Sequence, residues 1–197
     1  MTGAADTGPE SAPAVVIGGS AGAVQALLRI LPALPADYPA PVLVVVHIPA
    51  DRDNALVPLL QGRCRMAVKE AEDKEPAKPG VIYFAPSDYH LLAETDRTLS
   101  LSSDEPVNMS RPAIDVLFES AADAFGPALT AVVLTGANSD GAQGVKAVAA
   151  AGGVAVVEDP TGAYASAMPD AALKACPAAT SMDLDAIASY LSRLGTT

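Results

Sequence analysis

The chain has 197 residues, half of them apolar, which is enough to bury one hydrophobic core. Its 23 acidic and 12 basic residues give a net charge of −11, which disfavours binding to nucleic acid or to an anionic membrane. No apolar run is long enough to span a bilayer, and the N-terminus lacks the order of a signal peptide. We therefore expect a cytoplasmic protein that does not insert into membranes.

The composition also bears on the N-terminal residues and on the two cysteines. Residues 1–13 are mostly Gly, Ala, Pro, Ser and Thr, so we expect a disordered leader followed by a single domain over residues 14–197. Cys64 and Cys176 lie far apart without metal-ligand spacing. Both are expected to be reduced thiols with no part in a site.

The first strand and helix enclose the most informative stretch. Residues 14–18 predict a buried strand and residues 23–31 a helix, so Ser20 lies at a strand-to-helix crossing. The pattern Gly18-x-Ser20-x-Gly22 fits a nucleophile elbow, in which small residues let the backbone turn sharply under an exposed hydroxyl.

Two alternatives compete with a nucleophile at this turn. A Gly-Ser-Gly cluster also forms plain tight turns. A dinucleotide-binding fingerprint would need glycine at the position of Ser20 and an acidic residue after the second strand, where His47 stands.

The rest of the chain alternates between strands and helices. Further strands are predicted at residues 41–46, 66–68, 81–84, 89–93, 98–102, 130–136 and 154–157. Helices are predicted at residues 54–60, from Ser110-Arg111-Pro112 to a stop at Gly126, at 142–151, at 169–175 and after a cap at Ser181. This order predicts an α/β fold with a doubly wound, mostly parallel sheet flanked by helices. The strands at 89–93 and 98–102 add an antiparallel hairpin.

Three polar residues each follow a predicted parallel strand. Ser20, His47 and Asp140 should therefore meet at the carboxyl edge of the sheet, where ligands bind in such folds. A serine hydroxyl needs a base, and a histidine oriented by a carboxylate supplies one. His47 closes a core strand, whereas an edge contact or a surface hydrogen bond explains His90 equally well, so placement favours His47.

The carboxylate partner is less certain from the residues alone. Asp140 could simply cap a helix, and Asp159 is a rival acid after the fourth strand. Asp115 is expected on the solvent face of its helix and Asp88 in a turn. The flexible glycines around Asp140 favour it over Asp159.

A resemblance bears on this choice. The chain resembles the catalytic domain of chemotaxis protein-glutamate methylesterases, the CheB family, from about Ala14 to the last helix. The segments that carry the resemblance are Ile17–Gly22, Val45–Pro49, Ala85–Leu91, Ser110–Phe118 and Leu134–Gly141. It implies that Ser20 is the nucleophile, His47 the general base and Asp140 the orienting carboxylate. It also implies an oxyanion hole from the backbone N–H groups of Ala21 and Ala137, and no metal or cofactor.

The resemblance also implies binding partners, and at some positions this chain differs from the family's usual motifs. The implied partner is the helical cytoplasmic region of a methyl-accepting chemoreceptor, with a separate response-regulator protein as a further candidate. Ala21 replaces the family's usual threonine, and Ala137-Asn138 replaces its usual Met-Gly. The receiver domain that commonly precedes the esterase is not expected before residue 14, so neither is regulation by phosphorylation of this chain.

Two other function classes remain open. A phosphate- or nucleotide-binding module would use the amides of residues 19–22 as an anion nest and would not depend on His47. A catalytically silent adaptor would bind receptors without turnover, for which Ala137-Asn138 is the only support in the sequence.

Overall fold

The computed structural model describes residues 12–47 and 55–194. Its main sheet has seven strands, and every neighbouring pair is parallel. In spatial order the strands are β3 (Ala67–Glu70), β4 (Val81–Phe84), β2 (Val42–Val46), β1 (Ala14–Gly19), β7 (Leu129–Val133), β8 (Val154–Glu158) and β9 (Thr180–Met182). A separate antiparallel hairpin pairs β5 (His90–Ala93) with β6 (Leu99–Ser102).

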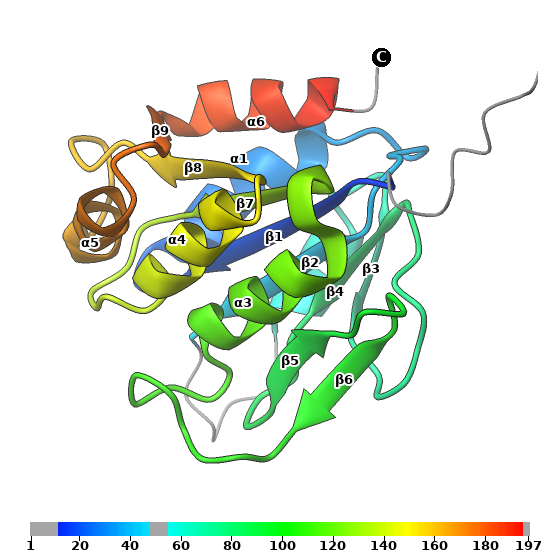
Figure 1. Ribbon diagram of the computed structural model, residues 1–197. Coiled ribbons are helices and arrows are strands. Elements are labelled where there is room, and N and C mark those ends of the chain that lie inside the picture. The colour runs from blue at the N-terminus through cyan, green and yellow to red at the C-terminus, as the bar shows by residue number, and fades with distance from the viewer. Residues whose placement is uncertain (1–11, 48–54, 195–197) are drawn as a thin grey trace, which may run out of the picture.

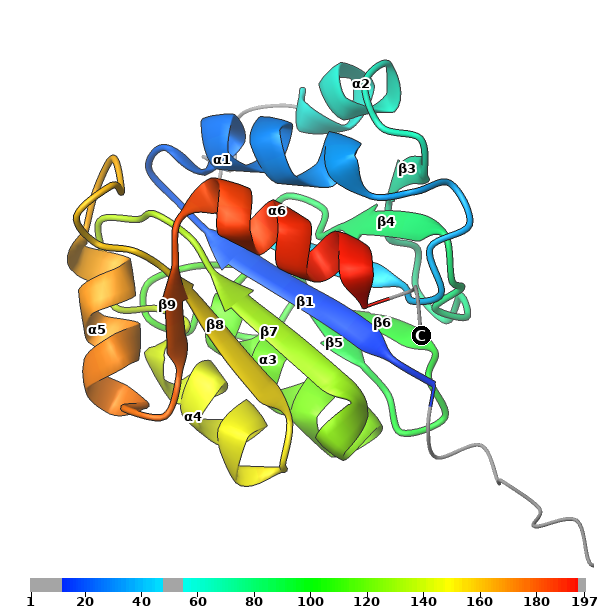
Figure 2. The same cartoon turned by 90° about the horizontal axis from the view of Figure 1, so that it is seen from above.

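Helices cover both faces of this sheet (Figures 1 and 2). One face carries α1 (Ala23–Ile30), the short η2 (Leu31–Ala33), α2 (Leu56–Gln61) and α6 (Leu184–Arg193). The other carries α3 (Ile114–Phe125), which η3 (Gly126–Ala128) follows, α4 (Ala142–Ala150), α5 (Ala167–Ala175) and the hairpin. The doubly wound fold with an antiparallel hairpin is confirmed.

The central strand β1 contributes to two hydrophobic cores because its side chains alternate between the faces of the sheet. Val15 and Ile17 pack in the core beneath α1 and α6. Ala14 and Val16 pack in the core beneath α3 and α4. All six residues of β1 are buried, which is why this segment is a continuous apolar run in the sequence.

The predicted boundaries fail at three places. Residues 110–112 do not start α3: Ser110 pairs with Val107 across an isolated bridge, and the Arg111 guanidinium binds Asp88, so the helix begins at Ile114. The strand predicted at residues 130–136 ends at Val133. Further on, the N–H of Gly136 donates to the carbonyl of Ala165, which lies in the loop before α5 and not in a neighbouring strand.

The third error concerns the C-terminal segment. Ser181 does not cap the last helix but lies within β9, a short strand that the sequence analysis missed. Asp183 caps α6 instead, and its side chain accepts a hydrogen bond from the N–H of Ala186 at 2.8 Å.

The helices that follow β1 and β7 leave the sheet on opposite sides. The chain passes from β1 into α1 on one face and from β7 into α4 on the other. Since β1 and β7 are neighbours, this is a topological switch point, where the loops after parallel strands separate into a crevice. In the described ranges no helix is both long and apolar enough to cross a membrane.

Candidate active site

Ser20 is held at the end of β1 by backbone contacts on both sides. Its N–H donates to the carbonyl of Thr135 at 2.9 Å, and its carbonyl accepts from the N–H of Ala23 at 3.0 Å. Gly22 caps α1 with a φ of 85°, and a Cβ there would lie 2.6 Å from the Cβ of Tyr164. The turn therefore requires glycine at position 22, as the elbow pattern predicts.

His47 lies beside Ser20 because their two strands run in register. Gly19 pairs with Val46, and the N–H of His47 donates to the carbonyl of Gly19 at 3.2 Å. Residues 20 and 47 therefore leave the sheet next to each other, about 5 Å apart as strand neighbours are. The His47 side chain is 13% exposed, so solvent and small molecules can reach the ring.

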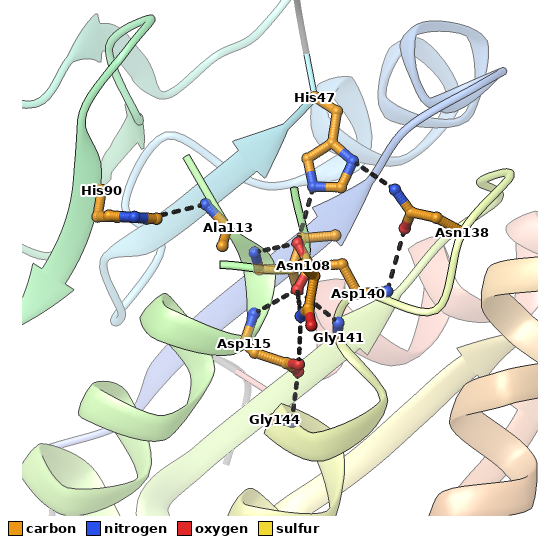
Figure 3. Close-up of polar contacts among 10 residues, drawn as sticks. His47, His90, Asn108, Ala113, Asp115, Asn138, Asp140, Gly141 and Gly144 are labelled. Carbon is orange, nitrogen blue, oxygen red and sulfur yellow. Dashed lines mark hydrogen bonds and ion pairs between the residues drawn. The ribbon is translucent and has the colours of Figure 1, made fainter. Parts of the chain in front are cut away.

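Asp140 meets His47 from the loop between β7 and α4 (Figure 3). Its Oδ2 is 2.8 Å from Nε2 of His47, and its side chain is fully buried. The carboxylate also accepts four further hydrogen bonds: Oδ2 from Ile114 N–H at 2.6 Å, and Oδ1 from Asn108 Nδ2 at 2.8 Å, Asp115 N–H at 3.1 Å and Gly141 N–H at 3.1 Å.

These contacts keep the Asp140 carboxylate ionised. Burial alone would raise the pKa of Asp140, but the hydrogen bonds from His47, Ile114 and Asn108 lower it below its ordinary value. A buried negative charge against one ring nitrogen fixes the orientation of the imidazole and stabilises it when it gains a proton.

Asn108 and Asp115 form a support beneath Asp140 that the sequence analysis did not predict. The Asn108 amide donates to both Asp140 and Asp115, each at 2.8 Å, from a backbone with a φ of 51°. Asp115 also accepts from the N–H of Gly144 at 2.7 Å. The expectation that Asp115 faces solvent is wrong: only 6% of it is exposed, and burial raises its pKa.

His90 occupies a different environment from His47. It is 2% exposed, and both of its ring nitrogens contact the main chain. Nδ1 accepts from the N–H of Ala113 at 3.2 Å, and Nε2 is 3.0 Å from the carbonyl of Glu105, to which it therefore donates. His90 joins the hairpin to the start of α3 and has no free nitrogen for chemistry.

The rival acid Asp159 does not reach His47. Its carboxylate accepts from the N–H and hydroxyl of Thr161, at 2.9 and 2.8 Å, and these bonds lower its pKa. It lines a hollow with Arg29 and Asp183, apart from the Asp140 contacts. Of the two candidate acids, the structure brings Asp140 to the histidine.

The two N–H groups predicted for an oxyanion hole flank the Ser20 turn. Ala21 follows Ser20 directly, and Ala137 follows Gly136 in the loop after β7. Within the described residues neither N–H donates to a protein acceptor, although neighbouring amides in both loops are paired. As whole residues, Ala21 is half-buried and Ala137 is exposed.

Asn138 is the remaining side chain at the ring. Its Nδ2 lies 3.3 Å from Nδ1 of His47, so both ring nitrogens have a partner from one loop. Nothing in the sequence pattern pointed to this contact beyond the departure from the family's usual glycine. Both cysteines are free, and a search of the described residues finds no group of three metal-ligating side chains.

Comparisons with known proteins agree on one family. The sequence profile described as CheB methylesterase matches residues 15–191. A provisionally named protein-glutamate methylesterase/protein-glutamine glutaminase of Leptospira interrogans is 47% identical over 181 residues, which cover 92% of this chain and 94% of that protein. A protein-glutamate methylesterase/protein-glutamine glutaminase of Halalkalibacterium halodurans is 39% identical over 163 residues, or 81% of this chain and 47% of its own length.

A solved structure agrees with these sequences. The crystal structure of the Thermotoga maritima CheB methylesterase catalytic domain superposes with a TM-score of 0.89 at 35% sequence identity, and the match covers 93% of this chain and 99% of that domain. Fold, order of elements and sequence thus point to the same conclusion: the chain belongs to the CheB methylesterase family.

Proposed function

We propose that this protein hydrolyses γ-methyl esters of glutamate on the helical cytoplasmic region of methyl-accepting chemoreceptors and releases methanol. The observation that carries the proposal is the 2.8 Å contact between His47 and the buried Asp140, beside Ser20 at the switch point of the sheet. The names of its relatives support the same substrate class, since they are called protein-glutamate methylesterases.

In the first step the Ser20 hydroxyl attacks the ester carbonyl. Its proton passes to Nδ1 of His47, because Nε2 is engaged by Asp140. The bond to the methoxy group then breaks, and the proton on His47 goes to this leaving group to give methanol. The enzyme is left as an acyl ester on Ser20.

In the second step water takes the place of the alcohol. His47 accepts a proton from the water, which attacks the acyl ester, and the proton returns to the Ser20 oxygen as glutamate leaves. Asp140 remains a carboxylate throughout, in keeping with its lowered pKa. No proton or electron is left over, so the cycle requires neither a metal nor a cofactor.

The tetrahedral intermediates of both steps carry an oxyanion. The N–H groups of Ala21 and Ala137, which donate to no acceptor among the described residues, are the donors we assign to it. Each such donor contributes about 3 kcal/mol to the stabilisation of the transition state. Because these donors belong to the main chain, the substitution of Ala21 and Ala137 for the family's usual residues leaves them in place.

The same route serves glutamine as well as methyl glutamate. An attack of Ser20 on a side-chain amide gives the same acyl-enzyme with ammonia as the leaving group. The relatives are also named protein-glutamine glutaminases, so we include deamidation of receptor glutamines in the proposal.

The test is methanol release from methylated receptor membranes by the parent protein, Ser20→Ala and His47→Ala. We expect release by the parent and loss of it in both variants, while Ser103→Ala, a change at an exposed serine away from the site, leaves the rate unchanged. All variants should keep the parent's melting temperature within a few degrees, which separates lost chemistry from lost folding.

The two other function classes predict different results. A silent adaptor would bind receptors without releasing methanol, and substitution of Ser20 or His47 would not change that binding. An anion-binding module would bind nucleotide or phosphate saturably and would be indifferent to His47→Ala. Absence of methanol from the folded parent would overturn the esterase proposal.

A further inference from the structure

Asn138 touches the ring that the proposed reaction uses as its base. Its carboxamide is half-buried and lies between the His47 ring and the backbone of Asp140 (Figure 3). Nδ2 is 3.3 Å from Nδ1 of His47, and Oδ1 accepts the N–H of Asp140 at 3.0 Å. The resemblance predicts glycine at this position, so this chain places a carboxamide where the family's usual motif has no side chain.

The contact with Asp140 fixes which way the amide faces. A main-chain N–H can only donate, so the oxygen of Asn138 must be the atom next to it, and the NH₂ group must face the ring. An NH₂ group can only donate as well. Nδ1 of His47 is therefore the acceptor, and it carries a lone pair and no proton.

The opposite side of the ring gives the same tautomer. A neutral imidazole has one N–H and one lone pair. The carboxylate of Asp140 takes the hydrogen bond from Nε2, so the lone pair is on Nδ1. This is the only ring atom that can receive the Ser20 proton, and its single lone pair is already occupied by Asn138.

The length of the bond indicates that it can be displaced. At 3.3 Å the contact lies just beyond the usual range of N–H hydrogen bonds, whereas the bond to Asp140 is 2.8 Å long. Among the described residues, no hydrogen bond joins the Ser20 hydroxyl to the ring. The structure thus has a base that is correctly protonated but engaged by a weak donor in place of the nucleophile.

We propose that Asn138 is a positioning residue that caps Nδ1 of His47 in the free enzyme and gives the lone pair up to the Ser20 hydroxyl during acylation. The inference rests on the proposed function in so far as His47 is the base. Asn138 favours the tautomer of His47 that has its lone pair on Nδ1. The reaction must break the hydrogen bond from Asn138 to Nδ1 before that lone pair can take the Ser20 proton. Loss of one weak hydrogen bond corresponds to a rate change of about threefold to tenfold.

The test uses a small fluorophosphonate, which labels an activated serine without a receptor. The Ser20 oxygen forms a bond to phosphorus, fluoride leaves, and the hydroxyl proton passes to His47. The maximal labelling rate is measured by intact mass for the parent, Asn138→Gly and Asn138→Asp. Ser139→Ala is the matched control, since Ser139 is an exposed neighbour in the same loop.

If Asn138 caps Nδ1, the two substitutions should change the maximal labelling rate in opposite directions. Asn138→Gly removes the donor and should raise the labelling rate by about threefold to tenfold. Asn138→Asp keeps an oxygen for the N–H of Asp140 but places an acceptor against Nδ1, which then favours the wrong tautomer. Labelling should slow by about tenfold or more, and the nitrogen NMR signal of Nδ1 should move toward that of a protonated ring nitrogen.

A structural role alone predicts the reverse order. If Asn138 only ties the loop through the N–H of Asp140, Asn138→Asp should match the parent and Asn138→Gly should be slower. Either of these results overturns the cap and leaves the proposed function intact. If the parent is not labelled at Ser20, or its labelling ignores His47→Ala, the proposed function fails and the cap with it. The fluorophosphonate concentration that gives half the maximal labelling rate should be the same in the parent and in both Asn138 variants, because Asn138 contacts the His47 ring and not the reagent.

Discussion

The two histidines of this chain lie in regions that use the same side chain in opposite ways. His47, at the carboxyl edge of the sheet, is held by side chains from one loop: the carboxylate of Asp140 and the amide of Asn138. His90, the first residue of hairpin strand β5, is held by the main chain at Glu105 and Ala113 and is buried. Nδ1 of His47 thus has a side-chain donor at 3.3 Å, whereas Nδ1 of His90 has a main-chain donor at 3.2 Å.

The difference lies in what each partner can do when a proton moves. A carboxylate can stabilise an imidazolium, whereas a main-chain N–H cannot accept a proton and would face the new N–H of a protonated ring. His90 thus serves as a link between the hairpin and the start of α3. In the proposed reaction His47 gains a proton at Nδ1 once Asn138 gives up its contact there, while Asp140 stays in place at Nε2. The hydrogen-bond partners of the two rings, more than their exposure, distinguish the histidine that we propose as the base from the one that links two elements.

The largest expected effect compares the two histidines directly. His47→Ala should lower kcat for methanol release by about 10⁴-fold or more with little change in stability. His90→Ala should lower the free energy of unfolding by about 2 kcal/mol, because it leaves the N–H of Ala113 without its partner, while kcat of the folded protein stays within about tenfold. Urea unfolding and steady-state rates measure both. Equal kcat losses would break the comparison.

Asp140→Asn should have the next largest effect. It replaces the charge against Nε2 with a neutral group that can hold the wrong tautomer. If Asp140 orients the base as proposed, kcat should fall by about 10⁴-fold, the loss known for this change in a serine protease triad. Asp159→Asn is the matched control, because Asp159 contacts only its own turn. A larger loss from Asp159→Asn than from Asp140→Asn would mean that the wrong acid has been assigned.

Asn108→Gly should have an intermediate effect. Glycine accepts the φ of 51° without strain, so the change removes only the amide that joins Asp140 to Asp115. A hydrogen bond to a charged group contributes about 1.5–3 kcal/mol, so kcat should fall by about 10-fold to 100-fold. Met109→Gly controls for the loop, since Met109 has a φ of 60° and is 97% exposed. Equal losses in both variants would attribute the effect to the loop.

The smallest effect is expected at Glu158, a buried carboxyl held by the main chain. Burial raises its pKa above the ordinary 4.5, although the N–H of Thr135 donates to it at 2.7 Å. A raised pKa contributes stability below pH 4.5 that is lost as the pH rises through the native value. In Glu158→Gln the side-chain oxygen can still accept the hydrogen bond from Thr135, but the side chain does not ionise, so stability is not lost as the pH rises. Its melting temperature should exceed the parent's by up to about 3 °C near pH 8 and match it near pH 4. If the melting temperatures of the parent and Glu158→Gln changed in parallel with pH, the raised pKa of Glu158 would be contradicted.

The sheet was predictable from the sequence because its strands carry local signals. The buried run of β1, the glycine turn after it and the apolar face of α3 all appear at the predicted places. The short strand β9 has no such signal, since its three residues are polar or half-exposed and pair only with β8. Its position depends on its neighbour and not on its own composition.

The site was predictable in part for the same reason. Ser20, His47 and Asp140 follow strands, so the topology alone brings them together. Asn108 contacts Asp140 from a loop 32 residues away with a left-handed backbone, and no periodicity marks such a residue. Asp115 has the spacing of an exposed helical position, but α4 packs over it and the N–H of Gly144 binds its carboxylate. Asn108 and Asp115 support Asp140 through contacts between residues far apart in the sequence, and local sequence patterns do not indicate such contacts.

The order of the strands also governs when the site can exist during protein synthesis. β1 pairs with β2, which follows it closely, but also with β7, where Ala14 meets Leu129. A nascent chain that has passed β2 thus carries Ser20 and His47, but Asp140 is made 93 residues after His47. Because domains fold as units, Ser20 and His47 stay without Asp140 until β7 docks. The candidate site can therefore form only after the chain has been made beyond Asp140, late in the synthesis of the domain.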